Sequence, residues 1–283
     1  MNAPDRKPLI VIPCLNEQAF IGQLLHQLLA DPGLDDPLIV VVDGGSQDGT
    51  RAIVEGIAAG DPRVRLLPNP RRIQSAGVNL AARRFGRGRT WLVRIDAHAG
   101  YPDAYVSRLI DEAVTTGAAS VVVAMETQGD SGFQRAAAVA QTSRLGTGGS
   151  AHRIAGASGW VEHGHHALFR LEAFLGCGGY DESFSHNEDA ELDVRLIMAG
   201  RRIWLTDQVG MTYVPRGTPQ ALWRQYMNYG RGRARTVLKH RTRLRLRQAL
   251  PLVVAPAALA ALAAPLWWPA ALPALVWAMT CLI

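Results

Sequence analysis

The sequence predicts an α/β fold with a mostly parallel central sheet. Short apolar runs such as Leu9–Cys14 and Leu38–Val42 alternate with longer segments whose apolar residues recur at helical spacing. This alternation is typical of βαβ units, in which helices connect parallel strands. Polar residues follow several of the runs, and open α/β sheets bind ligands beyond the carboxyl ends of their strands. The 283 residues therefore suffice for one large domain with a ligand site, plus an appendage.

The expected elements follow one another in a regular order. Apolar runs predict strands over 9–14, 38–42, 64–67, 91–95 and 120–125, and helical patterns cover 17–30, the region around 53–57, 74–85 and 105–115. Residues 127–165 are rich in Gly, Ser and His, and are expected to form a loop-bearing region that receives a second substrate. A further helical pattern runs through Leu192 and Met198.

Charge is distributed unevenly along the chain. From Arg216 onward there are ten Lys or Arg and no Asp or Glu, so 20 basic and 24 acidic residues remain in 1–215. The net charge of +6 thus divides into +10 for the tail and −4 for the rest. The ten basic residues of the tail lie within residues 216–247, here called the basic collar. Basic charge confined to one segment argues against a nucleic-acid-binding protein. Three widely spaced cysteines fit neither a metal finger nor a disulfide framework, which is typical of a reducing compartment.

The tail itself carries the strongest membrane signal. Residues 248–283 contain no charged side chain, and a membrane span needs roughly 20 apolar residues. We expect a globular domain over 1–215, a basic juxtamembrane helical segment over 216–247 and a transmembrane segment over 248–283, either a single span or a truncated hairpin. The basic collar and the absence of an apolar leader before Pro8 then place the globular domain on the cytoplasmic side of the plasma membrane. The alternative is a helical hairpin buried in a soluble protein.

Asp96 and His98 follow the apolar run 91–95 and form the most informative motif. Side chains two residues apart at a strand end share a face, so both can reach one ion. A carboxylate and an imidazole predict a divalent metal, Mn²⁺ or Mg²⁺, beside a bound diphosphate. Imidazole shifts the preference toward Mn²⁺.

Two further strand ends predict parts of a nucleotide site. Asp43 precedes Gly44 and Gly45, which allow a sharp turn and close approach of a ligand, while its carboxylate can accept hydrogen bonds. The spacing matches neither a dinucleotide fingerprint nor a P-loop, which disfavours a dehydrogenase. Glu17 stands where a helix begins, so it is either a ligand-binding residue or a capping group. Arg72 faces either phosphate or solvent.

Glu188 and Asp189 open the helical pattern near residue 192. Paired acids at this position either complement the helix dipole or supply a general base for a hydroxyl group. His163, His165 and His166 contribute to acceptor binding or a second metal contact, or are incidental, as histidine-rich loops without regular ligand spacing usually are.

Five motifs occur in the order seen in inverting glycosyltransferase family 2, which the chain resembles over about residues 8–205. They are Pro13-x-x-Asn-Glu17, Asp43-Gly-Gly-Ser-x-Asp-Gly-Thr50, Asp96-x-His98, Gly178-Gly-Tyr-Asp-Glu182 and Asn187-Glu-Asp189. A closer likeness is to the ExoA-type succinoglycan glucosyltransferases, in which a Tyr-Gly-Arg-Gly-Arg-Ala-Arg stretch, here Tyr229–Arg235, precedes a membrane segment. The Gln-x-x-Arg-Trp motif of processive members is missing after Gln225, which argues against a polymerising synthase.

The resemblance implies a GT-A fold and a set of site residues. Nucleotide binding falls to Pro13, Asn16, Glu17, Asp43, Arg72 and Asp96. Asp96 and His98 would hold the metal, with His98 replacing the usual second aspartate. Asp189 would be the catalytic base and Glu188 its neighbour.

The implied activity is inverting transfer of a hexose such as glucose from a nucleotide sugar, expected to be UDP-linked, to a lipid-linked saccharide. Two rival interpretations remain. A nucleotidyltransferase usually has a glycine-rich basic loop after its first strand, whereas Cys14–Glu17 is acidic and lacks glycine. A catalytically inactive, membrane-tethered nucleotide-sugar binder is disfavoured by Glu188 and Asp189, and weakly favoured by His98.

Overall fold

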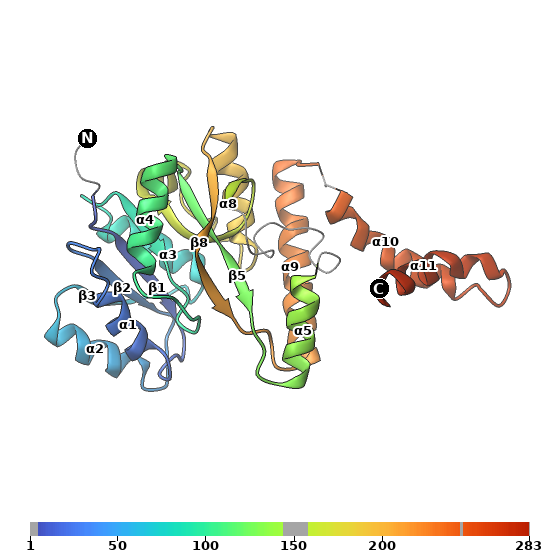
Figure 1. Ribbon diagram of the computed structural model, residues 1–283, viewed down its shortest axis with the longest axis horizontal. Helices are drawn as coiled ribbons and strands as arrows, with labels where there is room; N and C mark the ends of the chain where they lie inside the picture. The colour runs from blue at the N-terminus through green and yellow to red at the C-terminus, as the bar shows by residue number, and fades with distance from the viewer. Residues whose placement is uncertain (1–4, 144–157, 244–245, 283) are drawn as a thin grey trace.

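A computed structural model describes residues 5–143, 158–243 and 246–282. The strands found in these residues form one eight-stranded sheet in the order β3-β2-β1-β4-β7-β5-β8-β6. Six of them run in one direction, while β7 and β6 run antiparallel to their neighbours. The prediction of a mostly parallel sheet is confirmed (Figure 1).

The first half of the chain alternates strand and helix as expected. Its elements are β1 Leu9–Cys14, α1 Ile21–Leu29, β2 Leu38–Asp43, α2 Thr50–Gly60, β3 Val64–Pro68, α3 Gln74–Phe85, β4 Trp91–Arg94, α4 Tyr105–Thr116 and β5 Ser120–Thr127. Each strand begins at its predicted residue, because the buried apolar run that defines it is bounded by polar or turn residues.

The second half is less regular. It contains α5 Gly132–Thr142, β6 Gly159–Val161, β7 His165–Arg170, α7 Leu171–Gly176, α8 Glu188–Met198 and β8 Ile203–Tyr213. The expectation of a loop-bearing region over 127–165 was therefore wrong for 132–142, which is helical, and for 159–161, which is a strand. Ser131 caps α5, accepting from the Gln134 amide while the Gln134 side chain accepts from the Ser131 amide, a capping box that stabilises the helix start. Residues 144–157 lie outside the described residues.

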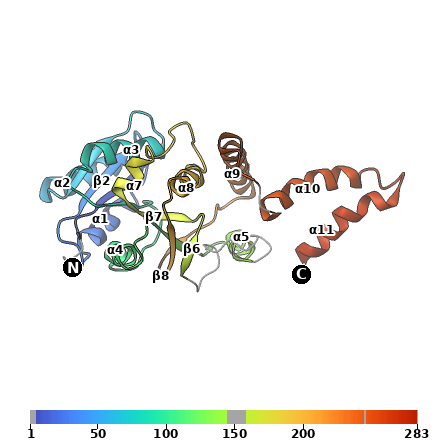
Figure 2. The same cartoon turned by 90° about the horizontal axis from the view of Figure 1, so that it is seen from above.

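Side-chain alternation along β1 divides the core into two layers. Ile10 and Ile12 belong to the hydrophobic cluster that includes residues of α1, α2 and α4, whereas Leu9 and Val11 belong to the cluster that includes residues of α3, α7 and α8. Figure 2 shows α1 and α4 on one side of the sheet and α3, α7 and α8 on the other. Helices on both faces explain why the central strands are apolar on both sides.

The strand order brings the predicted polar motifs together. β1 pairs in parallel with β2 on one side and with β4 on the other. The carboxyl ends of these three strands therefore lie at one edge of the sheet. From β1 the chain adds β2 and β3 on one side and then β4 on the other, so a topological switch point lies between β1 and β4. Asp43 is the last residue of β2, and Asn16 and Asp96 follow β1 and β4 at the same edge.

Three helical segments follow β8: α9 Pro219–His240, α10 Leu246–Ala261 and α11 Leu272–Leu282, with a 3-10 turn, η2 Trp268–Ala271, before α11. The last two helices extend away from the sheet as an arm (Figures 1 and 2). The prediction of a transmembrane segment over 248–283 is not supported. Within the described residues no helix is both long and apolar enough to cross a membrane, because the chain breaks near Pro265 and Pro269 into helices of 16 and 11 residues.

Candidate active site

The loops after β1 and β2 are joined by hydrogen bonds. The Asn16 amide donates to Ser46 Oγ (2.9 Å), and Asn16 Oδ1 accepts from the Gln47 amide (2.9 Å). The Glu17 amide donates to Thr50 Oγ1 (2.8 Å). Asn16 adopts a left-handed backbone conformation with φ 58°, which asparagine tolerates better than most residues. The two predicted nucleotide-binding loops thus form one unit.

Asp43 forms the floor of this unit. Its carboxylate is 3% exposed and accepts hydrogen bonds from the Gly45 amide (3.2 Å) and the Ser46 amide (3.0 Å). Gly45 has φ +97°, a conformation in which a side chain would be strained. The Arg72 guanidinium lies beside Gly45, with Nε 3.5 Å from the place where a Cβ would stand. Pro13, in register with Val42, completes the adjoining strand end.

His98 points to the rim of the site. Its side chain is 57% exposed, and Nδ1 lies 2.9 Å from Glu17 Oε1. A cavity of about 690 Å³ opens beside it, between α1 and residues 97–103. Glu17 therefore contacts His98 directly, a pairing that links the first strand end to the predicted metal motif.

Asp96 lies deeper, between two basic groups. Its Oδ1 is 3.8 Å from Arg94 Nε, and its Oδ2 is 3.5 Å from His165 Nε2. The Asp96 amide donates to the Tyr101 hydroxyl (2.8 Å). Among the residues that the structure describes, no three His, Cys, Asp or Glu side chains form a ready metal site. In this structure His98 contacts Glu17, whereas Asp96 contacts Arg94 and His165.

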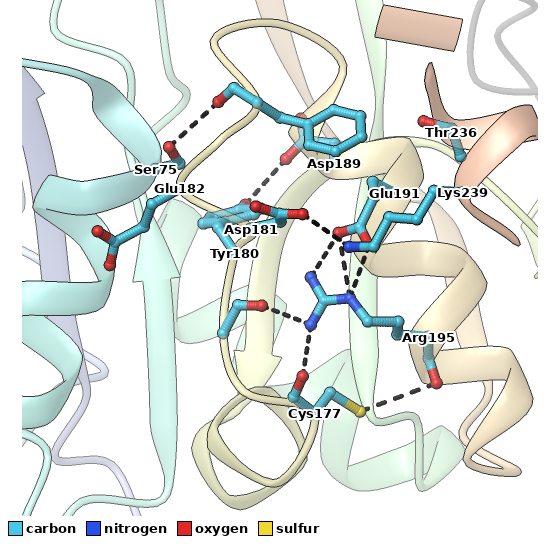
Figure 3. Close-up of polar contacts among 12 residues, drawn as sticks. Ser75, Cys177, Tyr180, Asp181, Glu182, Asp189, Glu191, Arg195, Thr236 and Lys239 are labelled. Carbon is cyan, nitrogen blue, oxygen red and sulfur yellow. Dashed lines mark hydrogen bonds and ion pairs between the residues drawn. The ribbon is translucent and has the colours of Figure 1, made fainter. Parts of the chain in front are cut away.

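Asp189 is held by a buried cation. Arg94 Nη1 donates to Asp189 Oδ1 (2.8 Å). The Tyr180 hydroxyl donates to the same oxygen (2.8 Å), and Figure 3 shows Tyr180 beside Asp189. Burial disfavours the Arg94 charge, but Asp189 and Asp96 outweigh it and raise the Arg94 pKa above its ordinary value. Burial and the nearby Asp189 also raise the Tyr180 pKa. Both donors therefore stay protonated and fix the carboxylate.

Glu188 neighbours Asp189 at the first turn of α8. Burial and the negative charge of Asp189 raise the pKa of Glu188 from its ordinary 4.5 to about 7. A carboxylate that exchanges its proton near neutral pH is suited to proton transfer. The helix start therefore combines Asp189, which is held by the Arg94 guanidinium and the Tyr180 hydroxyl, with Glu188, which titrates near neutrality.

Sequence reasoning missed two residues of the site, Arg94 and Tyr180, and gave too little weight to a third, His165. Arg94 is a charge inside an otherwise apolar buried strand, a signal that it needs an acidic partner. Tyr180 lies within the Gly-Gly-Tyr-Asp-Glu motif, yet nothing local predicts its contact with Asp189. Of the histidine cluster, His165 approaches Asp96, while His163 Nδ1 lies 2.5 Å from Asp193 Oδ2. The side chain of His166 lies outside the described residues.

Comparison with known proteins identifies the family. Residues 9–176 match glycosyl transferase family 2, and residues 93–282 match glycosyl transferase family group 2. The chain is 56% identical over 274 residues to the succinoglycan biosynthesis protein ExoA of Rhizobium meliloti (strain 1021), covering 97% of this chain and 83% of that protein. The chain therefore belongs to glycosyl transferase family 2 and is a glycosyltransferase of the ExoA type.

Solved structures support the GT-A-like fold. The mannosyltransferase PcManGT from Pyrobaculum calidifontis, in complex with GDP-Man and Mn²⁺, superposes with a TM-score of 0.62 at 20% identity. That match covers 98% of this chain and 77% of the mannosyltransferase. GalNAc-T7 with UDP, GalNAc and Mn²⁺ gives a TM-score of 0.60 at 14% identity, over 83% of this chain and 48% of GalNAc-T7. At these identities the likeness establishes the fold alone.

The raised pKa of Glu188 predicts a pH-dependent stability difference between the wild type and Glu188→Gln. Between pH 4.5 and about 7 the folded protein keeps a proton that the unfolded chain has lost, so the wild type loses stability as pH rises through this window. The Gln variant lacks this loss. Its unfolding free energy relative to the wild type should therefore rise across the window, by at most about 3 kcal/mol, and then level off. Urea denaturation over a pH series measures the difference; parallel curves for the two proteins would contradict the prediction.

Proposed function

We propose that this family 2 glycosyltransferase transfers a hexose, such as glucose, from a UDP-sugar to a lipid-linked saccharide with inversion at the anomeric carbon. The observation that carries the proposal is the acid pair at the start of α8, tied through buried Arg94 to the strand edge that bears Asp96. The 56% identity to a succinoglycan biosynthesis protein supports a role in exopolysaccharide assembly.

The nucleotide would occupy the joined loops after β1 and β2. Asp43 would accept hydrogen bonds from the base, while the segment Pro13–Glu17 lines the other wall. Arg72 beside Gly45 would contact base or phosphate. The glycine pair there leaves the backbone accessible to a ligand.

The donor diphosphate would lie beside Asp96 and His98. Asp96, His98 and Glu17 bring negative charge and an imidazole to this rim, so an anionic diphosphate needs a cation there. Carboxylate oxygen and imidazole nitrogen are ligands that Mn²⁺ accepts, and Mg²⁺ takes the carboxylate readily. Asp96 and His98 would hold such an ion, which would neutralise the charge of the departing diphosphate.

Asp189 would act as the general base. As the acceptor oxygen attacks the anomeric carbon, the new C–O bond forms while the bond from that carbon to the diphosphate oxygen breaks. The hydroxyl proton passes to Asp189, and the nucleoside diphosphate leaves with the electron pair. A single displacement inverts the configuration and needs no covalent enzyme intermediate. Arg94 and Tyr180 keep the Asp189 carboxylate aimed during this step.

The C-terminal arm would place the enzyme at the cytoplasmic face of the plasma membrane, where a lipid-linked acceptor is anchored. Large apolar side chains are exposed along it, among them Leu259, Leu262, Leu266, Trp267, Trp268 and Trp277. The preceding segment carries the basic collar, which anionic headgroups attract. A short helical hairpin with this composition would lie in the membrane interface.

Asp189→Asn is expected to lower kcat by at least about 100-fold, because the amide keeps the shape of the carboxylate but takes no proton. Release of nucleoside diphosphate is measured with UDP-glucose, membrane extract as acceptor, and Mn²⁺ or Mg²⁺. Glu188→Gln serves as the matched variant and should retain more activity. Loss confined to Glu188→Gln would assign the base to Glu188 instead. Donor binding by the wild type without turnover under any metal would favour the inactive binder.

The full chain is expected to sediment with phosphatidylglycerol vesicles and less with phosphatidylcholine vesicles. Replacing both Trp267 and Trp268 by Ser should weaken binding by about tenfold or more, because two large apolar side chains no longer enter the interface. Trp223→Ser, an exposed tryptophan on α9 outside the arm, is the control and should bind as the wild type does. If the Trp267 and Trp268 double variant binds vesicles as tightly as the wild type and the Trp223→Ser control do, the arm does not contact lipid.

A further inference from the structure

Helix α9 carries a row of residues spaced four apart: Asn228, Gly232, Thr236 and His240. Residues at this spacing share one face of a helix. Gly232 and Thr236 are the buried residues of α9. The row coincides in part with the stretch Tyr229–Arg235, which the proposed chemistry does not use.

The middle of the row touches the residues immediately before the catalytic acids. A Cβ on Gly232 would lie 2.5 Å from the carbonyl oxygen of His186 and 2.6 Å from Asn187 Cβ, so only glycine allows this approach. Asn187 Nδ2 donates to Thr236 Oγ1 (3.2 Å). Asn187 is the N-cap of α8 and, like Asn16, adopts the left-handed conformation, with φ 65°.

The neighbouring face of α9 holds the loop that leads into α8. The Arg235 guanidinium donates to the Ser183 carbonyl (2.9 Å) and stacks on the Phe184 ring at 4.4 Å. Lys239 Nζ donates to Asp181 Oδ2 (2.7 Å). These contacts hold the middle of the segment between α7 and α8 against α9.

The end of the row reaches a buried carboxylate on α8. Glu191 is fully buried and accepts from Lys239 Nζ (2.6 Å), His240 Nε2 (2.8 Å) and the Arg195 guanidinium (2.6 Å; Figure 3). Arg195 also donates to the Gly179 carbonyl (2.7 Å) and to the Cys177 carbonyl. One buried acid thus joins α9, α8 and the segment before Tyr180, the residue that holds Asp189.

We propose that α9 is a strap that positions the catalytic acids, with Gly232 and Thr236 as its positioning residues. The contacts of α9 are made with residues 181–191, that is, with the segment before α8 and the first turn of α8, which carries Glu188 and Asp189. The inference rests on the proposed role of Asp189 as base. A displacement of about 1 Å at a reacting group can lower the rate about 100-fold. A small shift of α9 that moves the start of α8 is therefore enough to slow the reaction.

Gly232→Ala tests the strap, with Gly230→Ala as the matched control. A Cβ at Gly230 meets nothing within 4 Å, and both glycines lie in the same helix, so both substitutions add the same helix propensity. We expect Gly232→Ala to lower kcat at least about tenfold with KM for UDP-glucose changed less than about threefold, while Gly230→Ala matches the wild type. Thermal unfolding is recorded for each.

Thr236→Val and Thr236→Ser provide a second test should Gly232→Ala fail to fold. Valine removes the hydroxyl that accepts from Asn187, and serine restores it. Lower kcat in the valine variant with recovery in the serine variant supports the strap. Unchanged kcat in folded Gly232→Ala or Thr236→Val overturns it, even if thermal stability falls. Asp189→Asn is assayed in parallel: if it remains active, the proposed base is wrong, whereas an inactive Asp189→Asn beside a normal Gly232→Ala refutes the strap alone.

Discussion

The buried guanidinium of Arg94 is the interaction on which the arrangement of the site depends. Its charge is removed from water at the end of β4, and a buried charge is tolerated only when it is paired and hydrogen-bonded. Asp189 and Tyr180 accept hydrogen bonds from Arg94 Nη1 and belong to the second half of the chain. Asp96, from the same strand end as Arg94, adds an ion pair at 3.8 Å from Nε but no hydrogen bond. The strand edge and helix α8 are therefore held in one geometry by charge compensation as well as by apolar contact.

Apolar periodicity predicted the first half of the fold closely, because each strand there is a buried run between turn signals. It failed for elements whose formation depends on features other than the apolar pattern of their own residues. The strand β7 enters the sheet antiparallel between β4 and β5, a pairing that no local pattern announces. Helix α5 was missed because the surrounding region 127–165 is rich in Gly, Ser and His, although Ser131 and Gln134 form a capping box that the sequence shows. In the tail, composition suggested a membrane span, but closely spaced prolines divided it into short helices.

For the site, the sequence predicted which strand ends carry polar groups, since the carboxyl ends of parallel strands meet at one edge. It did not predict the partners. Arg94 and Asp189 are 95 residues apart, and their contact depends on how α8 lies against the sheet. His98 illustrates the same limit: its imidazole contacts Glu17 from another strand end, a partner that spacing along the chain does not predict. Residue type and spacing identify candidate groups, and the tertiary fold decides their pairing.

The four-residue spacing on α9 constrains the length of the chain as well as its composition. Each residue of an α-helix advances the direction of the side chain around the axis by about 100°. One residue inserted between Asn228 and His240 would therefore turn the later residues of the row away from α8. Surface loops of the same protein have no such phase and absorb insertions at small entropic cost. Among related sequences, gaps should therefore be rare between Asn228 and His240, even though this helix lies outside the nucleotide-binding half.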